Sequence, residues 1–386
     1  MTPTSPLYSI QDSAGAEFLP YGPSDAGVVV VESFGEFEAE YAAIRRGAGI
    51  MELPQRGLIE VRGADRLDFL HRFLTHDTLS LDDGQGRRAF LLSRQGRIDA
   101  DMIVLQNNDR TLLDIDRFAA AHVTAELNKF LFTEDVQVAD CSDAFVHLTL
   151  HGPHAAPLLG AAATQTDGDR AADLEPLHHR QAVISDQSCV VYRHDETGET
   201  GLHLLVPTGS AGAVYTALAD ASGGLVPEVE GGVRRTIHGR GIGWLAYNTA
   251  RIEAGTPIYH VDFGPDSLPH ETGLLDAAVS FTKGCYVGQE VVARMHNLGH
   301  PKRRLVGLRF ADETLPIAGS QLFEPTGDTS KTIGALTSSA LSPMLGNVAI
   351  GFAMIRWGKH QPGTTVSVHA EGTQVEGAVQ DLSFLH

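Results

Sequence analysis

Cysteine is scarce in this sequence of 386 residues, which contains only three, and no two of them form a CxxC pair. Such isolated thiols argue against a structural zinc site or an iron–sulfur cluster held by this chain alone. They also argue against a disulfide framework of the kind found in small secreted proteins. We therefore expect a cytoplasmic protein in which Cys141, Cys189 and Cys285 are reduced thiols.

Positive charge is also in short supply, because 29 lysines and arginines stand against 48 aspartates and glutamates, giving a formal net charge of −19. So acidic a chain is not expected to bind nucleic acid or an anionic membrane by bulk attraction. Long apolar runs are missing as well, since no stretch reaches the roughly 18 apolar residues of a membrane-spanning helix. The first ten residues have neither a basic start nor an apolar run, so we expect no signal peptide.

What is present is the composition of a globular protein, with 42% hydrophobic residues, and a length that favours two or three domains. Helices predicted over Glu36–Arg46, Arg117–Leu131 and Val233–His238 alternate with strand patterns, which indicates an α+β region over residues 1–300. After Gly299 short strand patterns predict a separate C-terminal β-barrel over residues 301–386. The clearest of these patterns are Leu305–Phe310, Thr332–Ser338, Val348–Met354 and Thr365–Val368.

One cysteine lies in a distinctive string, Phe-Thr-Lys-Gly-Cys-Tyr-Val-Gly-Gln-Glu, at residues 281–290. A helix predicted to follow Cys285 and the cation of Lys283 would both stabilise the thiolate, and so lower the cysteine pKa. Gly284 and Gly288 allow a tight backbone path around the sulfur. The string predicts a reactive thiol, although a buried and inert cysteine at a glycine-rich turn is the commoner situation.

A second string, Thr-Gly-Glu-Thr-Gly at residues 197–201, precedes a predicted strand. The carboxylate of Glu199 could accept two parallel hydrogen bonds from a planar N–C–N donor, such as the aminopyrimidinone edge of a pterin. A hairpin turn with a solvated glutamate fits the same local sequence.

Two further strings contain carboxylates and an arginine. Asp99 and Asp101 share one face of a predicted strand because side chains alternate with a period of two. They could hold a metal, tune each other's protonation, or form an exposed strand face. Arg251 could clamp a ligand carboxylate or form a structural ion pair, and Tyr259 closes the same string.

Histidines gather between His147 and His154 and again at His296 and His300. Two histidines four residues apart on a helix can bind one metal ion. No suitable third ligand lies near His296 and His300 in the sequence, so we predict no metal site.

In this order the strings resemble the YgfZ/GcvT folate-binding family, whose YgfZ-type members are related to the T-protein of the glycine cleavage system. The resemblance covers nearly the whole chain, and its most specific string is Lys283–Glu290, since K-G-C-Y-x-G-Q-E marks the YgfZ branch. The other matching strings are Val61–Asp65, Gly96–Val104, Thr197–Gly201, Arg251–Asp262 and Pro269–Leu274.

The resemblance implies two interwoven α+β subdomains around a central funnel, with the β-barrel closing the arrangement. It also implies tetrahydrofolate in the funnel. Glu199 would then pair with the pterin ring and Asp101 would lie near the reactive folate nitrogens, while Arg251 and Tyr259 would line the pocket and Cys285 would face the funnel.

In function, the resemblance implies a tetrahydrofolate-binding accessory protein that supports the assembly or repair of iron–sulfur enzymes. Cys285, Lys283 and Asp101 would be its reactive groups, and its partners would be folate and iron–sulfur assembly proteins or client enzymes. Two alternatives stay open: a tetrahydrofolate-dependent aminomethyltransferase or demethylase of the T-protein type, and a folate-binding scaffold without chemistry. The cysteine string disfavours the transferase, as does Glu-Leu-Pro-Gln at residues 52–55, where T-proteins carry Asp-Val-Ser-His-Met.

Overall fold

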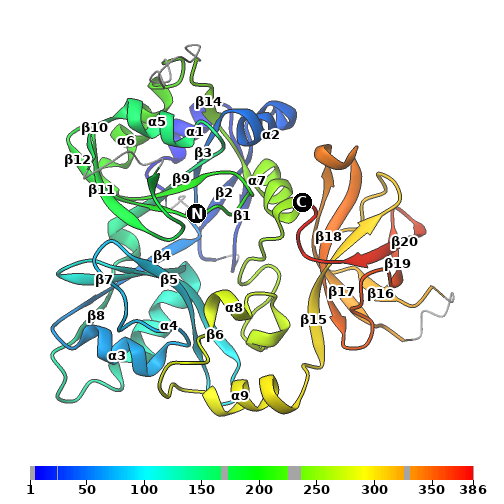
Figure 1. Ribbon diagram of the computed structural model, residues 1–386. Helices are drawn as coiled ribbons and strands as arrows, with labels where there is room; N and C mark the ends of the chain where they lie inside the picture. Colours follow the sequence, from blue (N-terminus) through cyan, green and yellow to red (C-terminus); the bar gives the residue numbers. More distant parts are fainter. Residues whose placement is uncertain (1–4, 24, 167–172, 225–235, 326–330, 386) are drawn as a thin grey trace. The chain divides into compact units, whose positions relative to one another are not determined.

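The computed structural model describes residues 5–23, 25–166, 173–224, 236–325 and 331–385 (Figure 1). The chain forms two compact units, and each unit is discontinuous in sequence. Unit 1 comprises residues 1–69, 79–88 and 102–247, and unit 2 comprises residues 70–78, 89–101 and 248–386. Among the described residues, no helix is long and apolar enough to cross a membrane.

A seven-stranded sheet with the order β10-β11-β12-β13-β9-β3-β14 forms the centre of unit 1 (Figure 1). Side chains alternate between its two faces because the strand period is two. One face packs Leu148, Val191 and Leu204 against helices α5 and α6 in a large apolar core. The bounds are β3 Ala48–Glu52, β9 Phe145–His151, β10 Ala163–Thr166, β11 His179–Ile184, β12 Gln187–Arg193, β13 Gly201–Pro207, β14 Gly239–Gly241, α5 Ala155–Ala162 and α6 Ala211–Asp220.

The opposite face of this sheet meets a second, five-stranded sheet with the order β5-β6-β7-β4-β8. Leu58, Leu105 and Leu112 of the second sheet form an apolar cluster with Val190 and Leu205 of the first. The bounds are β4 Arg56–Arg62, β5 Gly86–Leu92, β6 Ile98–Gln106, β7 Arg110–Asp116 and β8 Gln137–Asp140. Polar side chains continue this contact layer, and they are described with the candidate site below.

The sequence located several helices of unit 1 closely. The helix predicted over Glu36–Arg46 is confirmed as α2, Phe37–Arg46. The helix predicted from Arg117 is confirmed as α4, Arg117–Asn128, whose first turn is capped by the carboxylate of Asp116. The helix predicted over Val233–His238 lies partly outside the described residues, and its described part, from Thr236, is not helical. The remaining elements are α1 Tyr8–Ser13, β1 Glu17–Pro20, β2 Val29–Ser33 and α3 Arg66–Phe73.

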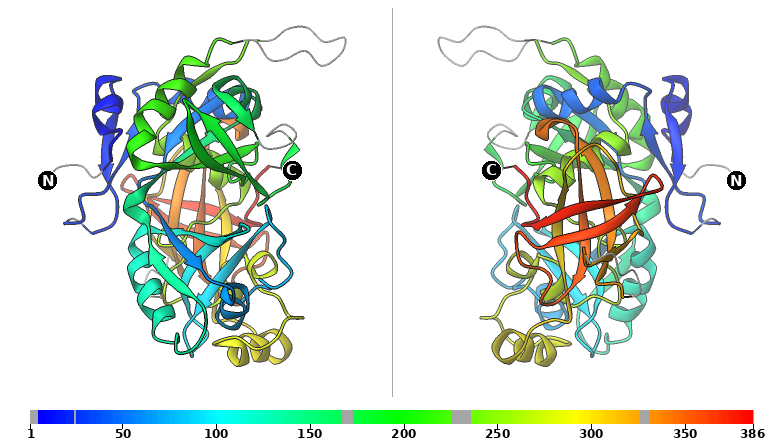
Figure 2. Two further views of the ribbon diagram at one scale, coloured as in Figure 1. Left: turned by 90° about the vertical axis from the view of Figure 1, so that its left-hand side faces the viewer. Right: turned by 90° about the vertical axis from the view of Figure 1, so that its right-hand side faces the viewer.

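Six strands of unit 2 close into a barrel in the order β15-β18-β17-β16-β19-β20 (Figure 2, orange and red). Their inward side chains, among them Leu308, Leu322, Ala353 and Val366, form one apolar cluster. The predicted C-terminal β-barrel is therefore confirmed, whereas the boundary after residue 300 stays a prediction. The strands are β15 Arg303–Phe310, β16 Gln321–Phe323, β17 Gly334–Ser342, β18 Val348–Arg356, β19 Thr365–Ala370 and β20 Thr373–Gln380.

The rest of unit 2 includes the C-terminal end of α3, adjoining parts of β5 and β6, and further short helices, of which α7 packs on the barrel. Ile252, near the end of α7, lies in an apolar cluster with Leu305, Ile350 and Phe352. The carboxylate of Glu253 accepts a hydrogen bond from Ser342. The helices are α7 Trp244–Ala254, α8 Leu275–Ala278 and α9 Gln289–Leu298.

Candidate functional site

The turn that carries Glu199 joins β12 to β13 in unit 1. Gly198 has a φ of +79°, which favours glycine over other residues. At Gly201 an added Cβ would lie 2.0 Å from the carbonyl oxygen of His194, so that position also requires glycine. The two glycines therefore define the path of the turn between the strands.

Arg45, in the last turn of α2, holds this turn in place. Its Nη1 donates a hydrogen bond of 2.7 Å to the carbonyl oxygen of Thr197 and lies 3.6 Å from Oε1 of Glu199. Its guanidinium lies over the ring of Tyr41, 5.4 Å from the centroid. Nothing in the local sequence marks Arg45, because a basic residue in the last turn of a helix is common and no short-range pattern links it to residue 199.

The Glu199 turn has unused hydrogen-bonding capacity. The side chain of Glu199 is 33% exposed, although it lies beside a nearly buried arginine. The hydroxyl of Thr197 is buried and has no hydrogen-bond partner among the described residues. A buried hydroxyl without a partner is costly. A planar ligand bearing several N–H groups fits both features, while the contact between Glu199 and a pterin stays a prediction.

Asp101 lies on β6 and belongs to unit 2. It is only 7% exposed, so the alternative of an exposed strand face is wrong for this residue. The hydroxyl of Tyr259 donates to the carbonyl oxygen of Asp99 at 2.8 Å and also contacts that of Ile98 at 3.3 Å. Tyr259 thus anchors the start of the strand that carries Asp101, and its contact with folate stays a prediction.

Arg251 forms a buried ion pair. Its Nη1 lies 2.7 Å from Oδ2 of Asp262, and both side chains are fully buried. The carboxylate of Asp262 also accepts hydrogen bonds from Thr337 and Ser338 of the barrel strand β17. Of the two roles considered for Arg251, this geometry matches the structural ion pair. The other role, a clamp for a ligand carboxylate, stays a prediction.

Lys283 caps the C-terminal end of helix α3. Its ammonium group donates hydrogen bonds to the carbonyl oxygens of His71, Leu74 and His76. Burial lowers the pKa of Lys283 to about 8, against the opposing effect of Asp77. These hydrogen bonds all go to backbone oxygens. The predicted lowering of the Cys285 pKa by Lys283 would therefore be an electrostatic effect without a hydrogen bond.

The three cysteines differ in accessibility as well as in sequence context. Cys285 is exposed and lies three residues before Gly288, the N-cap of α9. Cys189 is buried, and burial raises the pKa of its thiol to about 11. Burial also raises the pKa of Cys141. The thiol of Cys285 has the exposure that a reactive cysteine requires. Its reactive role and the effect of Lys283 on its pKa stay predictions.

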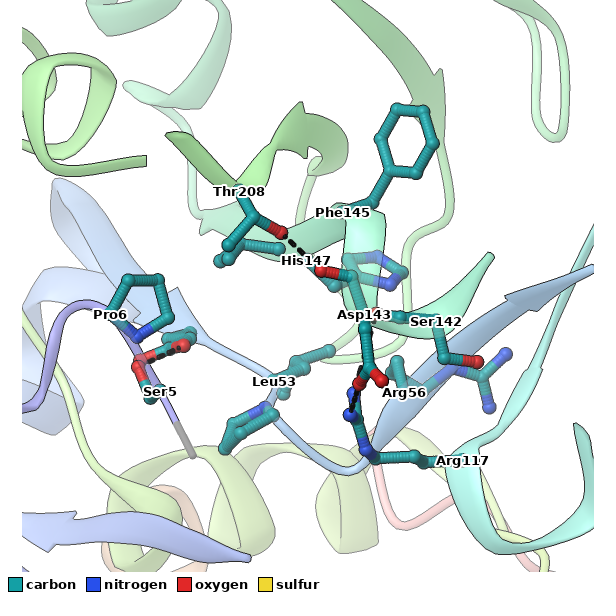
Figure 3. A pocket seen from close by; sticks show the side chains of 13 residues that line it. Ser5, Pro6, Leu53, Arg56, Arg117, Ser142, Asp143, Phe145, His147 and Thr208 are labelled. Carbon is teal, nitrogen blue, oxygen red and sulfur yellow. Dashed lines mark hydrogen bonds and ion pairs between the residues drawn. The ribbon is translucent and has the colours of Figure 1, made fainter. Parts of the chain in front are cut away.

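The segment that departs from the T-protein pattern lines a cavity in unit 1 (Figure 3). Leu53 lines it, as do Arg117 and Asp143, which form an ion pair. Glu52 also lines it, is mostly buried, and accepts hydrogen bonds from Ser5 and, at 2.9 Å, from Gln11. Burial raises the pKa of this carboxyl group. The departure at residues 52–55 thus provides structural contacts within unit 1.

Arg56 and His147 reach the same cavity and begin a polar layer between the two sheets (Figure 3). Arg56 pairs with Asp114 at 2.6 Å, and Asp114 accepts a hydrogen bond from Tyr192. His147 Nδ1 lies 3.3 Å from Asp114, and His147 Nε2 lies 3.0 Å from Nδ1 of His203. Burial opposes ionisation of Asp114, but the Arg56 guanidinium holds its pKa below the usual range. The members of this layer come from five strands, so no local pattern in the sequence marks it.

Comparison with family models gives two consecutive matches. The model described as the GCVT N-terminal domain matches residues 7–283. The model described as the glycine cleavage T-protein C-terminal barrel domain matches residues 303–385, which are the barrel strands and the end of the chain. Together the two models account for nearly the whole chain.

Relatives and a solved structure agree over the same length. An aminomethyltransferase of Bacillus pumilus is 27% identical over 390 residues, covering 100% of this chain and 99% of that protein. A probable aminomethyltransferase of Halobacterium salinarum is 28% identical, covering 99% and 98%. The crystal structure of glycine cleavage system aminomethyltransferase T from Bartonella henselae superposes with a TM-score of 0.83 at 26% identity, covering 98% and 97%. These findings confirm the predicted fold, and they favour the transferase alternative over the iron–sulfur role.

Proposed function

We propose that this chain, which belongs to the glycine cleavage T-protein family, binds tetrahydrofolate and transfers a one-carbon unit to or from it. The observation that carries the proposal is the match to aminomethyltransferases over essentially the full length of both proteins. A match of that extent includes the turns and strands that carry Glu199 and Asp101, rather than a single shared motif.

In unit 1, Glu199 binds the donor edge of the pterin ring. Its partial exposure leaves the carboxylate accessible, and Arg45 holds the turn through the carbonyl oxygen of Thr197. A carboxylate that accepts two parallel N–H bonds is specific as well as strong, because both bonds require one orientation of the ring. The hydroxyl of Thr197, which has no partner in the part of the chain that the structure describes, offers the ligand a further hydrogen bond.

In unit 2, the carboxylate of Asp101 stabilises positive charge that develops on the transferred carbon. A negative charge held in a mostly buried position acts strongly, because little water screens it. Tyr259 fixes the backbone of the strand on the N-terminal side of Asp101. Arg251 acts as a positioning residue, since its ion pair with Asp262 anchors α7 and the following loop to the barrel strand β17.

A second candidate function is the accessory role for iron–sulfur enzymes that is typical of the YgfZ branch. The observation that favours it is the exposed thiol of Cys285 within the string K-G-C-Y-x-G-Q-E. In this role the protein also binds tetrahydrofolate, while Cys285 meets the client or assembly protein, with Lys283 as the neighbouring cation.

One pair of experiments separates the two functions. The purified protein is incubated with tetrahydrofolate and either an aminomethylated lipoyl carrier or a methylated donor, and the folate product is quantified. We expect multiple turnovers, and Asp101→Asn should lower kcat by about a hundredfold, while Asp99→Asn on the same strand serves as the control. If no donor gives a folate product, and if Cys285→Ser fails to restore iron–sulfur enzyme activity in a deletion strain, the transferase function is wrong and the accessory function takes its place.

A further inference from the structure

Three side chains with metal-binding atoms converge at the hairpin between β12 and β13. Glu196 Oε2 lies 3.3 Å from Nε2 of His203, and Glu196 Oε1 lies 3.4 Å from Nδ1 of His194. One ligand atom from each residue lies within 4.8 Å of the others. Ligand atoms bound at about 2.0–2.1 Å to one tetrahedral ion lie about 3.4 Å apart, so the three are already near the spacing that a metal ion imposes.

A fourth side chain at this place lacks a partner. His151, at the end of β9, is fully buried, and neither of its ring nitrogens has a hydrogen-bond partner among the described residues. Its ring lies 5.9 Å from that of His203 and nearly perpendicular to it. A buried polar group without a partner costs free energy, which a hydrogen bond to a water molecule carried by the bound ion would recover. His151 is therefore an independent sign that the cluster binds something.

His203 also has a ring nitrogen that is left unused beside Glu196. Its side chain is 2% exposed, and its Nε2 has no hydrogen-bond partner among the described residues, although Oε2 of Glu196 lies 3.3 Å away. Its other ring nitrogen, Nδ1, lies 3.0 Å from Nε2 of His147 and 3.2 Å from the hydroxyl of Tyr192. Nε2 is therefore the atom of His203 that is left to bind an ion.

The surroundings also provide the second layer of contacts that metal sites use. A ligating histidine usually makes a hydrogen bond with its other ring nitrogen, and Nδ1 of His203 lies 3.0 Å from Nε2 of His147, whose Nδ1 lies 3.3 Å from Asp114. The hydroxyl of Tyr247 donates to Glu196 at 2.9 Å. The side chains of His194 and Glu196 are 20% and 15% exposed, which gives an ion a path from solvent.

We propose that unit 1 binds one transition-metal ion of the Zn²⁺ class through His194, Glu196 and His203. Two imidazoles and one carboxylate, with water in the fourth position, suit zinc and its neighbours, whereas Mg²⁺ and Ca²⁺ prefer all-oxygen sites. The neighbouring group of Asp114, His147 and His203 is less suitable, because the guanidinium of Arg56 on Asp114 repels a second cation. The prediction of no metal site rested on the missing third ligand near His296 and His300, whereas His194 and Glu196 lie in the turn after β12 and His203 lies on β13.

The test uses the full-length protein, stripped of metal with a chelator and titrated with Zn²⁺ by calorimetry, with Co²⁺ absorption as a second readout of coordination geometry. We expect one ion per chain and a tetrahedral Co²⁺ spectrum containing no thiolate band. Glu196→Gln and His194→Asn should abolish both signals. Tyr247→Phe removes only the hydrogen bond from Tyr247 to the ligand Glu196, and it should weaken Zn²⁺ binding by about tenfold to a hundredfold.

His178→Gln is the matched control, since it removes a partly exposed histidine of the same unit that lies outside the cluster. Circular dichroism of each variant establishes that it is folded. If the folded wild type binds no ion, or if Glu196→Gln and His194→Asn bind as tightly as the wild type, the proposal is overturned.

Discussion

Each unit contains an arginine–carboxylate pair, and the two pairs have opposite properties. Arg45 and Glu199 in unit 1 are 3.6 Å apart, and the glutamate is one-third exposed. Arg251 and Asp262 in unit 2 are 2.7 Å apart and both fully buried. A loose, partly hydrated pair can exchange one partner for a ligand at small cost, whereas separating a buried pair leaves a charge without compensation. An arginine–carboxylate pair thus suits ligand binding in unit 1 and structural stability in unit 2.

The largest expected effect is on stability and comes from the buried pair. Asp262→Ala should lower the free energy of unfolding of the cooperative unit that contains the barrel by about 3–5 kcal/mol, because the Arg251 cation then remains buried without its counter-ion. Urea denaturation measures this. Asp266→Ala, which removes an exposed partner of Arg303, is the control and should cost less than about 1 kcal/mol. If Asp262→Ala lowers the free energy of unfolding no more than Asp266→Ala does, the Arg251–Asp262 pair has no structural role.

An intermediate effect should follow from changing Glu199, and it should concern binding rather than stability. Glu199→Gln retains the shape of the side chain but removes the charge that strengthens its hydrogen bonds to the pterin edge. We expect calorimetry to show tetrahydrofolate affinity lowered by about tenfold to a hundredfold, with a urea midpoint close to that of the wild type. Glu126→Gln, on an exposed helix face, should leave both unchanged. Equal affinities of wild type and Glu199→Gln would exclude Glu199 from the site.

The smallest effect concerns Lys283, a cation whose partners are backbone carbonyls instead of a carboxylate. Burial lowers its pKa to about 8 in the folded chain, below the ordinary lysine value of about 10.4. Between these values the unfolded chain binds a proton that the folded chain does not, so this group makes the free energy of unfolding rise with pH. Below the folded pKa both states are protonated, and the destabilisation is fully present.

Lys283→Met should therefore remove part of the rise in stability between about pH 8 and pH 10. The measurement is the difference in urea midpoint between wild type and variant at several pH values, in which contributions from other groups cancel. Lys359→Met, at a partly exposed lysine paired with Glu324, should show no such pH dependence. A wild-type-minus-variant difference that stays constant with pH would contradict the burial argument for Lys283.

Patterns with short-range causes were predictable from the sequence. Helix α2 and the N-terminal end of α4 follow from apolar periodicity and capping, and the barrel follows from repeated short alternating strands. The hairpin turn at residues 197–201 follows from its glycines. The burial of Asp101 was not predictable, because an alternating strand does not show what covers each of its faces.

Contacts between distant segments were decided by tertiary structure. Local sequence left two roles open for Arg251, and the nearby Asp262 together with Ser338, 76 residues further along, favours the ion pair. The cation of Lys283 could be placed beside Cys285 from spacing, yet its hydrogen bonds reach His71, 212 residues away in sequence. Spacing shows which side chains are neighbours along the chain. It does not show which of the groups that surround a side chain in the fold it binds.

By itself, the sequence determined the order of the family strings, the α+β region followed by a β-barrel, and the scarcity of thiols and positive charge. These properties depend on composition and on periods of two and 3.6 residues, which act locally. Only the tertiary structure decided that Arg45 faces Glu199, that His194, Glu196 and His203 converge, and that the ring of His151 lies beside that of His203. The reason is physical: strand pairing brings β9 and β13 side by side although more than 50 residues separate them, and no local pattern records that pairing.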